Sequence, residues 1–313
     1  MATVYTLSGP VDTDELGVVL PHEHLPLTGF VSEDDRIPAG FAEEIRPWVP
    51  PLLDELYEYG GRTLVELTPI ACGRDIRFWQ ELAKDSKLHI VPCTGFYLQD
   101  RQPEWAKEQS ADELAQRFVR EIEVGIEDTQ VRAGIIKIAA DHLKGQDRKV
   151  FRAAAQASLQ TGAAITTHSC HAVREHFDFL VSAGAAPERI YIGHADYCDE
   201  QYSEQRYVCE NGGHLIFTTW GIQHLMDQDL LYSCVTTLIQ EGYVKHLLMS
   251  IDFAIRVCNM MEIGWMNYNV PGRTYSYLFR EVLPRLRELG VSKADIETMT
   301  VENGRKMLTI PNR

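Results

Sequence analysis

Two histidines separated by one residue, His22 and His24, stand at the end of a short apolar run near the N-terminus. Side chains two residues apart on a β-strand point to the same side of the sheet, so both imidazoles can face one centre. Further side chains able to bind a metal lie in or directly after later apolar runs, namely Lys137, His168, His194 and Asp252. Imidazole and carboxylate groups suit zinc and its divalent neighbours. Together these residues predict a metal site.

Each of these residues taken alone also fits an ordinary structural role. A His-x-His pair is more often not a metal site, and a histidine at a strand end is usually a hydrogen-bonded interior residue. The Lys137 side chain could extend to the surface, and Asp252 could cap a helix. The joint placement favours the metal site, because the coincidence would have to recur on five separate strands.

Lys137 is the unusual member, because a buried ammonium group beside two dications would be expelled electrostatically. Reaction of its amine with carbon dioxide would give a carbamate, an anion with two oxygens that can bridge two metals. Together with Asp252 and a bridging hydroxide, a carbamate would offset most of the charge of two dications, whereas an ammonium group would add to it. We therefore predict two divalent ions and an N6-carboxylysine at position 137.

The elements that must position these side chains are eight short apolar runs that alternate with longer amphipathic stretches. We interpret the runs as strands at residues 18–20, 63–67, 89–93, 134–138, 164–167, 190–192, 214–217 and 247–251. Helical patterns separate them, for example at residues 111–122, 150–160 and 230–240. Strands separated by helices of this length cannot pair as hairpins, so the predicted sheet is parallel and buried on both faces.

Eight such repeats favour a closed (β/α)₈ TIM barrel of the α/β class over an open doubly wound sheet. The candidate ligands then lie at the carboxyl ends of five strands, where barrel enzymes build their active sites. We expect one domain over residues 1–313, with a short hairpin within residues 1–17 that covers the bottom of the barrel.

The composition points to a small-molecule substrate. The formal net charge of −15 argues against nucleic-acid and anionic-membrane partners, because an acidic surface repels both. No stretch approaches the roughly 18 consecutive apolar residues that a membrane helix needs. The seven cysteines are scattered without the spacing of a disulfide framework or a zinc knuckle, and the N-terminus does not resemble a secretory signal. A reducing, cytoplasmic location is the default expectation.

At these residues the sequence resembles the phosphotriesterase family of the amidohydrolase superfamily. The similar segments are VLPHEH at residues 19–24, GRD at 73–75, GIEDTQVRAGIIK at 125–137, TTH at 166–168, IGH at 192–194 and GYVKHLLMSID at 242–252. They span nearly the whole chain in the expected order. The segment that ends at Lys137 is particularly specific.

The resemblance implies a more buried metal on His22, His24 and Asp252 and a more exposed metal on His168 and His194. Carboxylated Lys137 and a hydroxide would bridge them. Members of the family hydrolyse lactones, organophosphate triesters, or other carboxylic esters and amides. Zinc is the usual metal, and manganese, cobalt and iron are also found. The resemblance also implies a homodimer.

Three positions around the metals bear on the substrate. Family members generally carry an Asp three residues after the strand-six histidine, where this chain has Tyr197, and often a His or Arg at the mouth of strand seven, where it has Trp220. Both replacements leave the ligand set intact but put the substrate in doubt, and both could equally be packing residues. Tyr97, after strand three, resembles the lactonase branch, which places a tyrosine near the metals.

The predicted reaction is attack of a metal-bridging hydroxide on a carboxylic ester, with Asp252 accepting the proton of the nucleophile and passing it to the leaving alkoxide. The loop after strand eight is rich in large apolar residues and would form a greasy pocket wall, and its Arg256 could bind a substrate carboxylate or phosphate. The apolar residues of this loop are Phe253, Ile255, Met260, Met261, Trp265, Met266 and Tyr268. Ordinary core packing and a surface salt bridge are the competing interpretations.

A lactone is the first expectation for the substrate. The runner-up is a phosphotriester, and an amide or carbamate comes next, because the same hydroxide can attack an amide if the amine is protonated as it leaves. An alternative of another class is a non-catalytic barrel that binds metal and a small ligand.

Overall fold

A computed structural model describes residues 2–29, 31–168, 171–258 and 262–311 of the chain. Eight strands form one parallel sheet, and all eight lie where apolar runs predicted strands. Along the sheet their order is β11-β10-β9-β8-β7-β6-β5-β3, so each strand lies beside the one that precedes it among the eight. These strands are β3 (Val19–Glu23), β5 (Thr63–Glu66), β6 (His89–Phe96), β7 (Ile135–Ala139), β8 (Ile165–His168), β9 (Ile190–Gly193), β10 (His214–Phe217) and β11 (Leu247–Met249).

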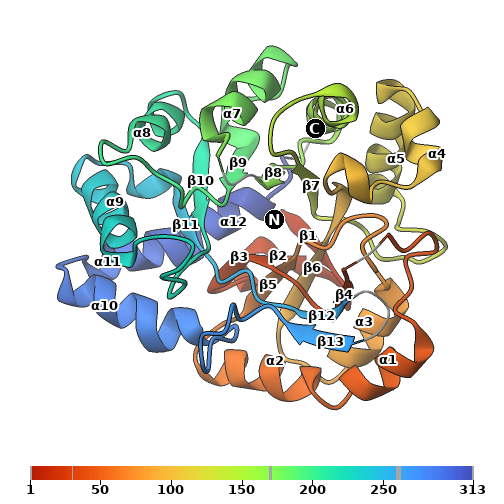
Figure 1. Ribbon diagram of the computed structural model, residues 1–313, viewed down its shortest axis with the longest axis horizontal. Helices are drawn as coiled ribbons and strands as arrows, with labels where there is room; N and C mark the ends of the chain where they lie inside the picture. Colours follow the sequence, from red (N-terminus) through yellow and green to blue (C-terminus); the bar gives the residue numbers. More distant parts are fainter. Residues whose placement is uncertain (1, 30, 169–170, 259–261, 312–313) are drawn as a thin grey trace.

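The sheet curls into a nearly closed barrel with helices on its outside (Figure 1). The strands are buried almost throughout, which is why they read as continuous apolar runs rather than as alternating patterns. The α-helices are α1 (Ala39–Ile45), α2 (Val49–Glu58), α3 (Ile76–Ala83), α4 (Glu104–Glu108), α5 (Ala111–Glu123), α6 (Gly145–Thr161), α7 (Val173–Ser182), α8 (Ser203–Glu210), α9 (Gln228–Gln240), α10 (Leu283–Glu288), α11 (Lys293–Glu297) and α12 (Asn303–Leu308).

Six single turns of other helix types complete the connections. They are η1 (Thr13–Glu15), η2 (Gln99–Arg101), η3 (Pro187–Arg189), η4 (Val244–His246), η5 (Leu278–Val282) and η6 (Thr298–Glu302). No helix in the described ranges combines the length and the apolar character that crossing a membrane requires.

The barrel is joined between its first and last strands by side chains as well as by backbone. No ladder connects β3 to β11 in the described sheet, but the Asp252 N–H donates to the His22 carbonyl at 3.1 Å. The Glu23 carboxylate accepts hydrogen bonds from the Ser250 hydroxyl and from the backbone N–H of Ile251 and Phe253. A buried glutamate of strand one therefore holds both neighbours of Asp252.

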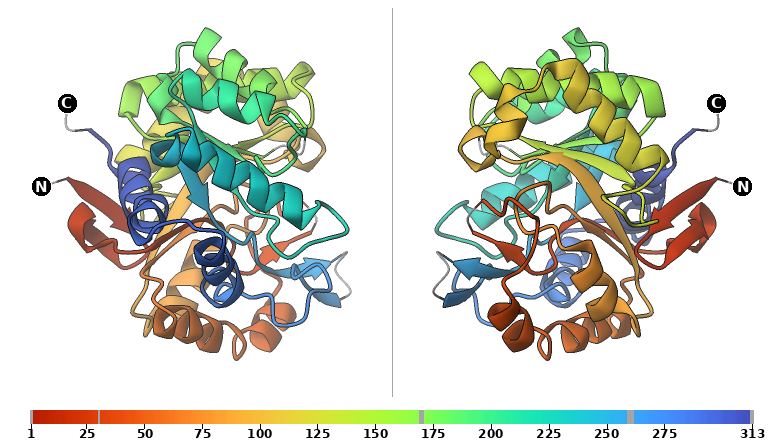
Figure 2. Two further views of the ribbon diagram at one scale, coloured as in Figure 1. Left: turned by 90° about the vertical axis from the view of Figure 1, so that its left-hand side faces the viewer. Right: turned by 90° about the vertical axis from the view of Figure 1, so that its right-hand side faces the viewer.

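The first strands of the chain form a hairpin outside the barrel sheet. Strands β1 (Thr3–Thr6) and β2 (Gly9–Asp12) pair antiparallel, and the Leu7 N–H donates to the carbonyl of Ile90 near the start of β6. Side chains of this segment pack with the barrel interior at the amino ends of the strands. In Figure 2 the hairpin and both termini lie at one end of the molecule.

At the opposite end a second small sheet stands over the barrel mouth (Figure 2). Its strands are β4 (Leu27–Thr28), β12 (Ile255–Cys258) and β13 (Glu262–Trp265), in the order β13-β12-β4. The sequence prediction of a loop after strand eight was therefore wrong in form, because β12 and β13 make a hairpin that pairs with β4. Met260 and Met261 lie outside the described residues.

Candidate metal centre

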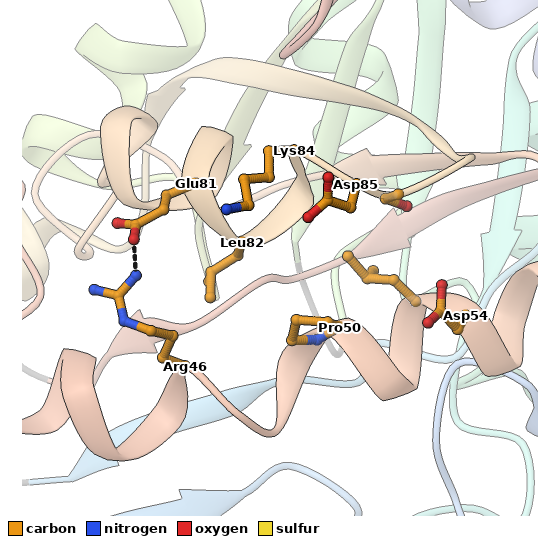
Figure 3. A pocket seen from close by; sticks show the side chains of 9 residues that line it. Arg46, Pro50, Asp54, Glu81, Leu82, Lys84 and Asp85 are labelled. Atoms are coloured by element: carbon orange, nitrogen blue, oxygen red, sulfur yellow. Dashed lines mark hydrogen bonds and ion pairs between the residues drawn. The ribbon is translucent and has the colours of Figure 1, made fainter.

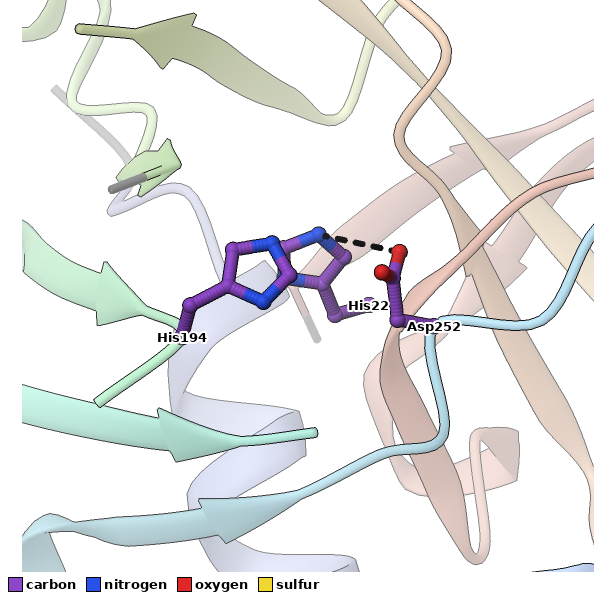
Figure 4. Close-up of side chains that lie close together, drawn as sticks. All are labelled: His22, His194 and Asp252. Atoms are coloured by element: carbon purple, nitrogen blue, oxygen red, sulfur yellow. Dashed lines mark ion pairs between the residues drawn. The ribbon is translucent and has the colours of Figure 1, made fainter. Parts of the chain in front are cut away.

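Three predicted ligands converge at the carboxyl ends of β3, β9 and β11 (Figure 4). His22 ends up beside His194, with ring centroids 4.6 Å apart, and His22 Nε2 lies 3.7 Å from Asp252 Oδ1. One ligand atom from each of the three residues lies within 4.8 Å of the other two. All three side chains are buried.

The remaining predicted ligands surround this group. His24 Nε2 lies 3.2 Å from Asp252 Oδ1, and the His168 ring lies 4.3 Å from the His194 ring, centroid to centroid. Lys137, which is 1% exposed, places its Nζ 2.8 Å from His22 Nε2. The structure thus brings all six predicted side chains to one centre, from five strands of the barrel.

The protonation of these groups suits a divalent cation. Burial lowers the pKa of His194 to about 4, so its imidazole is neutral near pH 7, which is the form that binds metals. Its Nε2 is buried and has no hydrogen-bond partner among the described residues. Burial alone would raise the pKa of Asp252, but the His24 imidazole beside its Oδ1 and the nearby His and Lys charges hold it below its ordinary value. The donor set therefore fits a metal.

Two of the ligands have an unusual backbone conformation. His194 and Asp252 both have a φ of +53°, in the left-handed region that residues other than glycine seldom adopt. Such strain persists where the surrounding structure holds it, and it is concentrated at functional sites. Here Asp252 is held by the hydrogen bond of its N–H to His22 and by those of its neighbours to Glu23.

Two buried carboxylates that the sequence analysis did not select stand behind the ligands. Glu66 is linked to His24 through Thr68, and Asp196 is linked to His194 through Thr218. A signal for Glu66 was present in the sequence, because an acidic residue inside the apolar run 63–67 needs a partner. Burial raises the pKa of Glu66 to about 8.

A cavity of about 310 Å³ opens directly onto the centre. Lys137, His168 and Asp252 line it together with His24. The Tyr97 hydroxyl lies 3.0 Å from His168 Nε2, where the sequence predicted a tyrosine near the metals. The other side chains of the cavity wall include Leu27, Cys72, Leu98, Asp100, Arg101, Arg256, Met266 and Tyr268.

The apolar residues after strand eight divide between this cavity and the core. Met266 and Tyr268 line the cavity, and the Tyr268 hydroxyl donates to Asp252 Oδ2 at 3.4 Å. Phe253 and Ile255 are buried in the core instead, and Trp265 stacks on Trp48 at the surface. Only some of the apolar residues that were predicted to form the pocket wall therefore line the cavity.

Trp220 and Tyr197 are not among the residues that line the cavity in the described part of the chain. Trp220 is fully buried, packs against Tyr232, and donates its indole N–H to the Phe217 carbonyl. Tyr197 packs against His171, with ring centroids 5.0 Å apart. The structure separates Trp220 from the pocket that it was expected to shape, because its side chain turns into the layer between barrel and helices.

A second cavity, of about 180 Å³, lies on the outer surface between α2 and α3 (Figure 3). Charged side chains line much of it, and Arg46 is paired with Glu81 across its edge. None of the six predicted ligands belongs to it. The chemistry of the molecule is therefore concentrated at the barrel mouth.

Comparison with known proteins gives the same picture over the whole chain. A solved structure of a weak promiscuous lactonase template engineered for organophosphate hydrolysis superimposes with a TM-score of 0.86 at 27% identity, covering 98% of this chain and 99% of that chain. The chain is 30% identical to a phosphotriesterase homology protein of Escherichia coli, covering 93% of this chain and 97% of the relative.

Two other relatives have names that state an activity. An aryldialkylphosphatase of Saccharolobus solfataricus is 27% identical, covering 96% of this chain and 97% of the relative, and a phospho-furanose lactonase of Mycoplasmopsis synoviae is 25% identical, covering 98% and 92%. These names support an enzyme, a metal-dependent hydrolase, over the non-catalytic barrel. The family model for the phosphotriesterase family matches residues 2–308. The chain therefore belongs to the phosphotriesterase family.

Proposed function

We propose that this hydrolase acts on a carboxylic ester, specifically a lactone, at a pair of divalent metal ions. The observation that carries the proposal is the Tyr97 hydroxyl, 3.0 Å from His168 Nε2, at the point where the ligand cluster meets the cavity. A phenol in this position can donate a hydrogen bond to an ester oxygen and orient the carbonyl group toward the centre. The lactonase names among the relatives agree with this assignment.

His22, His24 and Asp252 would hold one metal, and His168 and His194 the other. The ions would be zinc, with manganese, cobalt or iron as substitutes. When bound, such ions polarise the scissile carbonyl and supply a nucleophilic hydroxide near neutral pH.

Lys137 would join the two sites as a carbamate. Burial lowers the pKa of Lys137 to about 8, so a larger share of the amine is neutral than in an exposed lysine. The neutral amine is the form that reacts with carbon dioxide. Nζ lies 2.8 Å from His22 Nε2, which supports this role, because a carboxylate formed there would lie near the imidazoles of His22, His168 and His194.

Asp252 handles the proton. Its pKa is held below the ordinary range, so it is an anion that can accept the proton of the nucleophile. The Tyr268 hydroxyl, 3.4 Å from Oδ2, orients this carboxylate from the cavity side. Asp252 then returns the proton to the departing alkoxide, which completes the hydrolysis.

The cavity favours a substrate with an anionic arm. Arg256 and Arg101 both line it, and Arg101 donates to the Gly29 carbonyl from the same wall. Guanidinium groups bind carboxylates and phosphates through two parallel hydrogen bonds. The relative named for a phospho-furanose lactone supports this feature.

A phosphotriester is the second candidate, and an amide the third. The aryldialkylphosphatase name among the relatives favours the phosphotriester, and relatives named N-acetyltaurine hydrolase favour the amide. Tyr197 and Trp220 do not line the cavity in the described residues, so we assign the substrate contacts to Tyr97, Arg256, Arg101 and Tyr268.

We further propose a cytoplasmic homodimer. Free thiols at Cys72, Cys93, Cys198, Cys209 and Cys234 agree with a reducing compartment. The dimer is suggested by family resemblance, and light scattering of the purified protein tests it.

The experiment for the function combines metal analysis with a hydrolysis panel. Purified protein is assayed on neutral and anionic lactones, aryl esters, aryl phosphotriesters and N-acyl amides, with Asp252→Asn as the matched inactive control. We expect about two ions per chain and the highest kcat/KM on a lactone that carries a carboxylate or phosphate. A higher kcat/KM on phosphotriesters or amides would overturn the lactone assignment, and fewer than two ions in the fully active protein would overturn the binuclear one.

A further inference from the structure

Two buried threonines stand between a carboxylate and a metal-binding histidine. Thr68 Oγ1 lies 2.9 Å from His24 Nδ1 and 2.5 Å from Glu66 Oε1. Thr218 Oγ1 lies 2.8 Å from His194 Nδ1 and 3.1 Å from Asp196 Oδ2. All four threonine and carboxylate side chains are buried without measurable exposure.

The two arrangements are alike although they come from different strands. Glu66 is the last residue of β5 and Asp196 lies three residues after the end of β9, and both carboxyl groups also accept backbone N–H groups. Glu66 Oε1 accepts from the N–H of Leu25 and Thr68, and Asp196 Oδ1 accepts from the N–H of Thr218 and Thr219. Glu66 Oε1 already accepts two N–H groups, so it is an acceptor even where burial leaves the carboxyl protonated, with the proton on Oε2. Each threonine hydroxyl therefore donates its single proton to the carboxyl oxygen beside it.

The direction of the remaining hydrogen bond follows from this count. A threonine hydroxyl that donates to a carboxylate can only accept from the histidine, so the proton of the neutral imidazole must be on Nδ1. The Nε2 lone pairs of His24 and His194 are then directed at the centre. His194 agrees with this, because its Nε2 is buried without a partner among the described residues. At His24, Nε2 faces Asp252 Oδ1 at 3.2 Å, which sets a lone pair opposite a carboxylate oxygen unless a cation lies between them.

His22 shows that this support is selective. The ring Nδ1 of His22 is buried and has no hydrogen-bond partner among the described residues. Only the backbone N–H of His22 is held, by the Ser250 hydroxyl. One histidine of each metal site in the proposed function thus has a threonine behind it. For His194, whose φ is +53°, the hydrogen bond to Thr218 also fixes the ring on a strained backbone.

We propose that Thr68 and Thr218 are positioning residues that set the metal-binding tautomer of His24 and His194, each for a different one of the two metal ions. The assignment to two separate ions rests on the proposed binuclear centre. The tautomer itself rests only on the hydrogen bonds, so the two parts can fail separately. Hydrogen-bonding groups behind metal ligands typically contribute 10–100-fold to metal affinity.

Isosteric and conservative variants test the proposal. Thr68→Val and Thr218→Val remove the hydroxyl at nearly constant volume, whereas Thr68→Ser and Thr218→Ser keep it. Thr94→Val is the matched control, because Thr94 is a fully buried strand residue whose hydroxyl has no partner among the described residues. Zinc affinity is measured by competition with a chromophoric chelator, after circular dichroism has established that each variant is folded.

We expect each valine variant to weaken one of the two zinc ions about 10–100-fold and to leave the other unchanged. The double valine variant should weaken both, and the serine and Thr94→Val variants should match the wild type. Nitrogen-15 spectra of the metal-free protein, labelled at histidine, should show a protonated Nδ1 at His194 and a mixture of tautomers in Thr218→Val. Spectra of the zinc-loaded protein should show a protonated Nδ1 at His24.

Unchanged zinc affinity in folded valine variants, or equal losses in the serine variants, would overturn the positioning role. A metal-free wild type with His194 protonated on Nε2, or a zinc-loaded wild type without a protonated Nδ1 at His24, would overturn the tautomer. A wild type that binds fewer than two ions while showing the expected tautomers would instead count against the proposed binuclear centre alone.

Discussion

The Glu23 carboxylate accepts a hydrogen bond of 2.7 Å from the Ser250 hydroxyl, and the pair joins the first strand of the barrel to the last. The same hydroxyl accepts the backbone N–H of His22 at 2.9 Å. The residue between the predicted ligands His22 and His24 is therefore acidic for a structural reason, because its side chain accepts three hydrogen bonds. It replaces the missing ladder between β3 and β11 and holds the chain on both sides of Asp252.

Glu23→Gln should destabilise the metal-free protein by about 1–3 kcal/mol, because one of three donors would then face an amide NH₂ group and remain unsatisfied. Urea unfolding measures the change. Glu58→Gln, at an exposed position of α2, is the control and should stay within about 0.5 kcal/mol of the wild type. Equal stability of both variants would show that the junction between β3 and β11 does not depend on Glu23.

Lys137→Ala should lose metal and nearly all activity, because the variant can form no carbamate between the two sites. A small carboxylic acid added at millimolar concentration should restore part of both, since its carboxylate can occupy the space left by the side chain. Metal analysis and initial rates with and without the acid measure the effect. Full activity of Lys137→Ala without any addition would contradict the carbamate.

Arg256→Met should raise KM for a lactone with a carboxylate or phosphate arm about 10–100-fold, in line with the loss of a charge-assisted hydrogen bond. The kcat should change little, because Arg256 is not one of the predicted metal ligands. A neutral lactone of the same size serves as the substrate control, and Arg77→Met, whose exposed guanidinium pairs with Asp128, as the protein control. Equal KM effects on the charged and neutral lactones would rule out the anionic arm.

His214→Phe should make the protein less sensitive to acid. The His214 ring stacks on Tyr191 with its centroid 4.4 Å away, and burial lowers the pKa of His214 to about 3. A histidine with a lowered pKa stabilises the fold above its unfolded pKa of about 6.5, and this stability is lost progressively as the pH falls from there toward the folded value of about 3. In His214→Phe this loss of stability is absent, because phenylalanine has no group that titrates.

Urea unfolding of the metal-free protein at pH 6.5 and pH 4.5 measures this difference. The decrease in unfolding free energy between the two pH values should be smaller in His214→Phe than in the wild type. His224→Asn, at an exposed position, should behave like the wild type. A pH dependence in His214→Phe that equals that of the wild type would contradict the role of His214.

The strands, and the convergence of the six candidate ligands, could be predicted from the sequence because each depends on short-range patterns. Apolar runs mark strands buried on both faces, and the order of the ligands along the chain follows the order of the strands. The residues behind the ligands could not be predicted in the same way. Thr68 and Thr218 look like ordinary strand-end residues until the fold places them beside His24 and His194.

Three features around the ligands could not be predicted either, and each has its own reason. The β12–β13 hairpin has strands of only four residues, too short for their alternation of apolar and polar residues to stand out in the sequence. Its pairing with the two-residue strand β4 also depends on a segment far away in the chain. Trp220 has a large apolar ring that suits a pocket or a core equally well. Asp196, two residues after His194, supplies the buried carboxylate, while Tyr197 beside it was the position that drew attention.

The small sheet β13-β12-β4 is separate from the barrel sheet. Residues in it or next to it nevertheless line much of the cavity, among them Leu27, Arg256 and Met266. The groups that perform the reaction and the groups that select the substrate are thus encoded in separable pieces of the chain. Substitution of Leu27, Arg256 and Met266 can therefore change the substrate range of the enzyme while the six predicted metal ligands stay intact. That modularity makes this hairpin the natural target for laboratory evolution of substrate range.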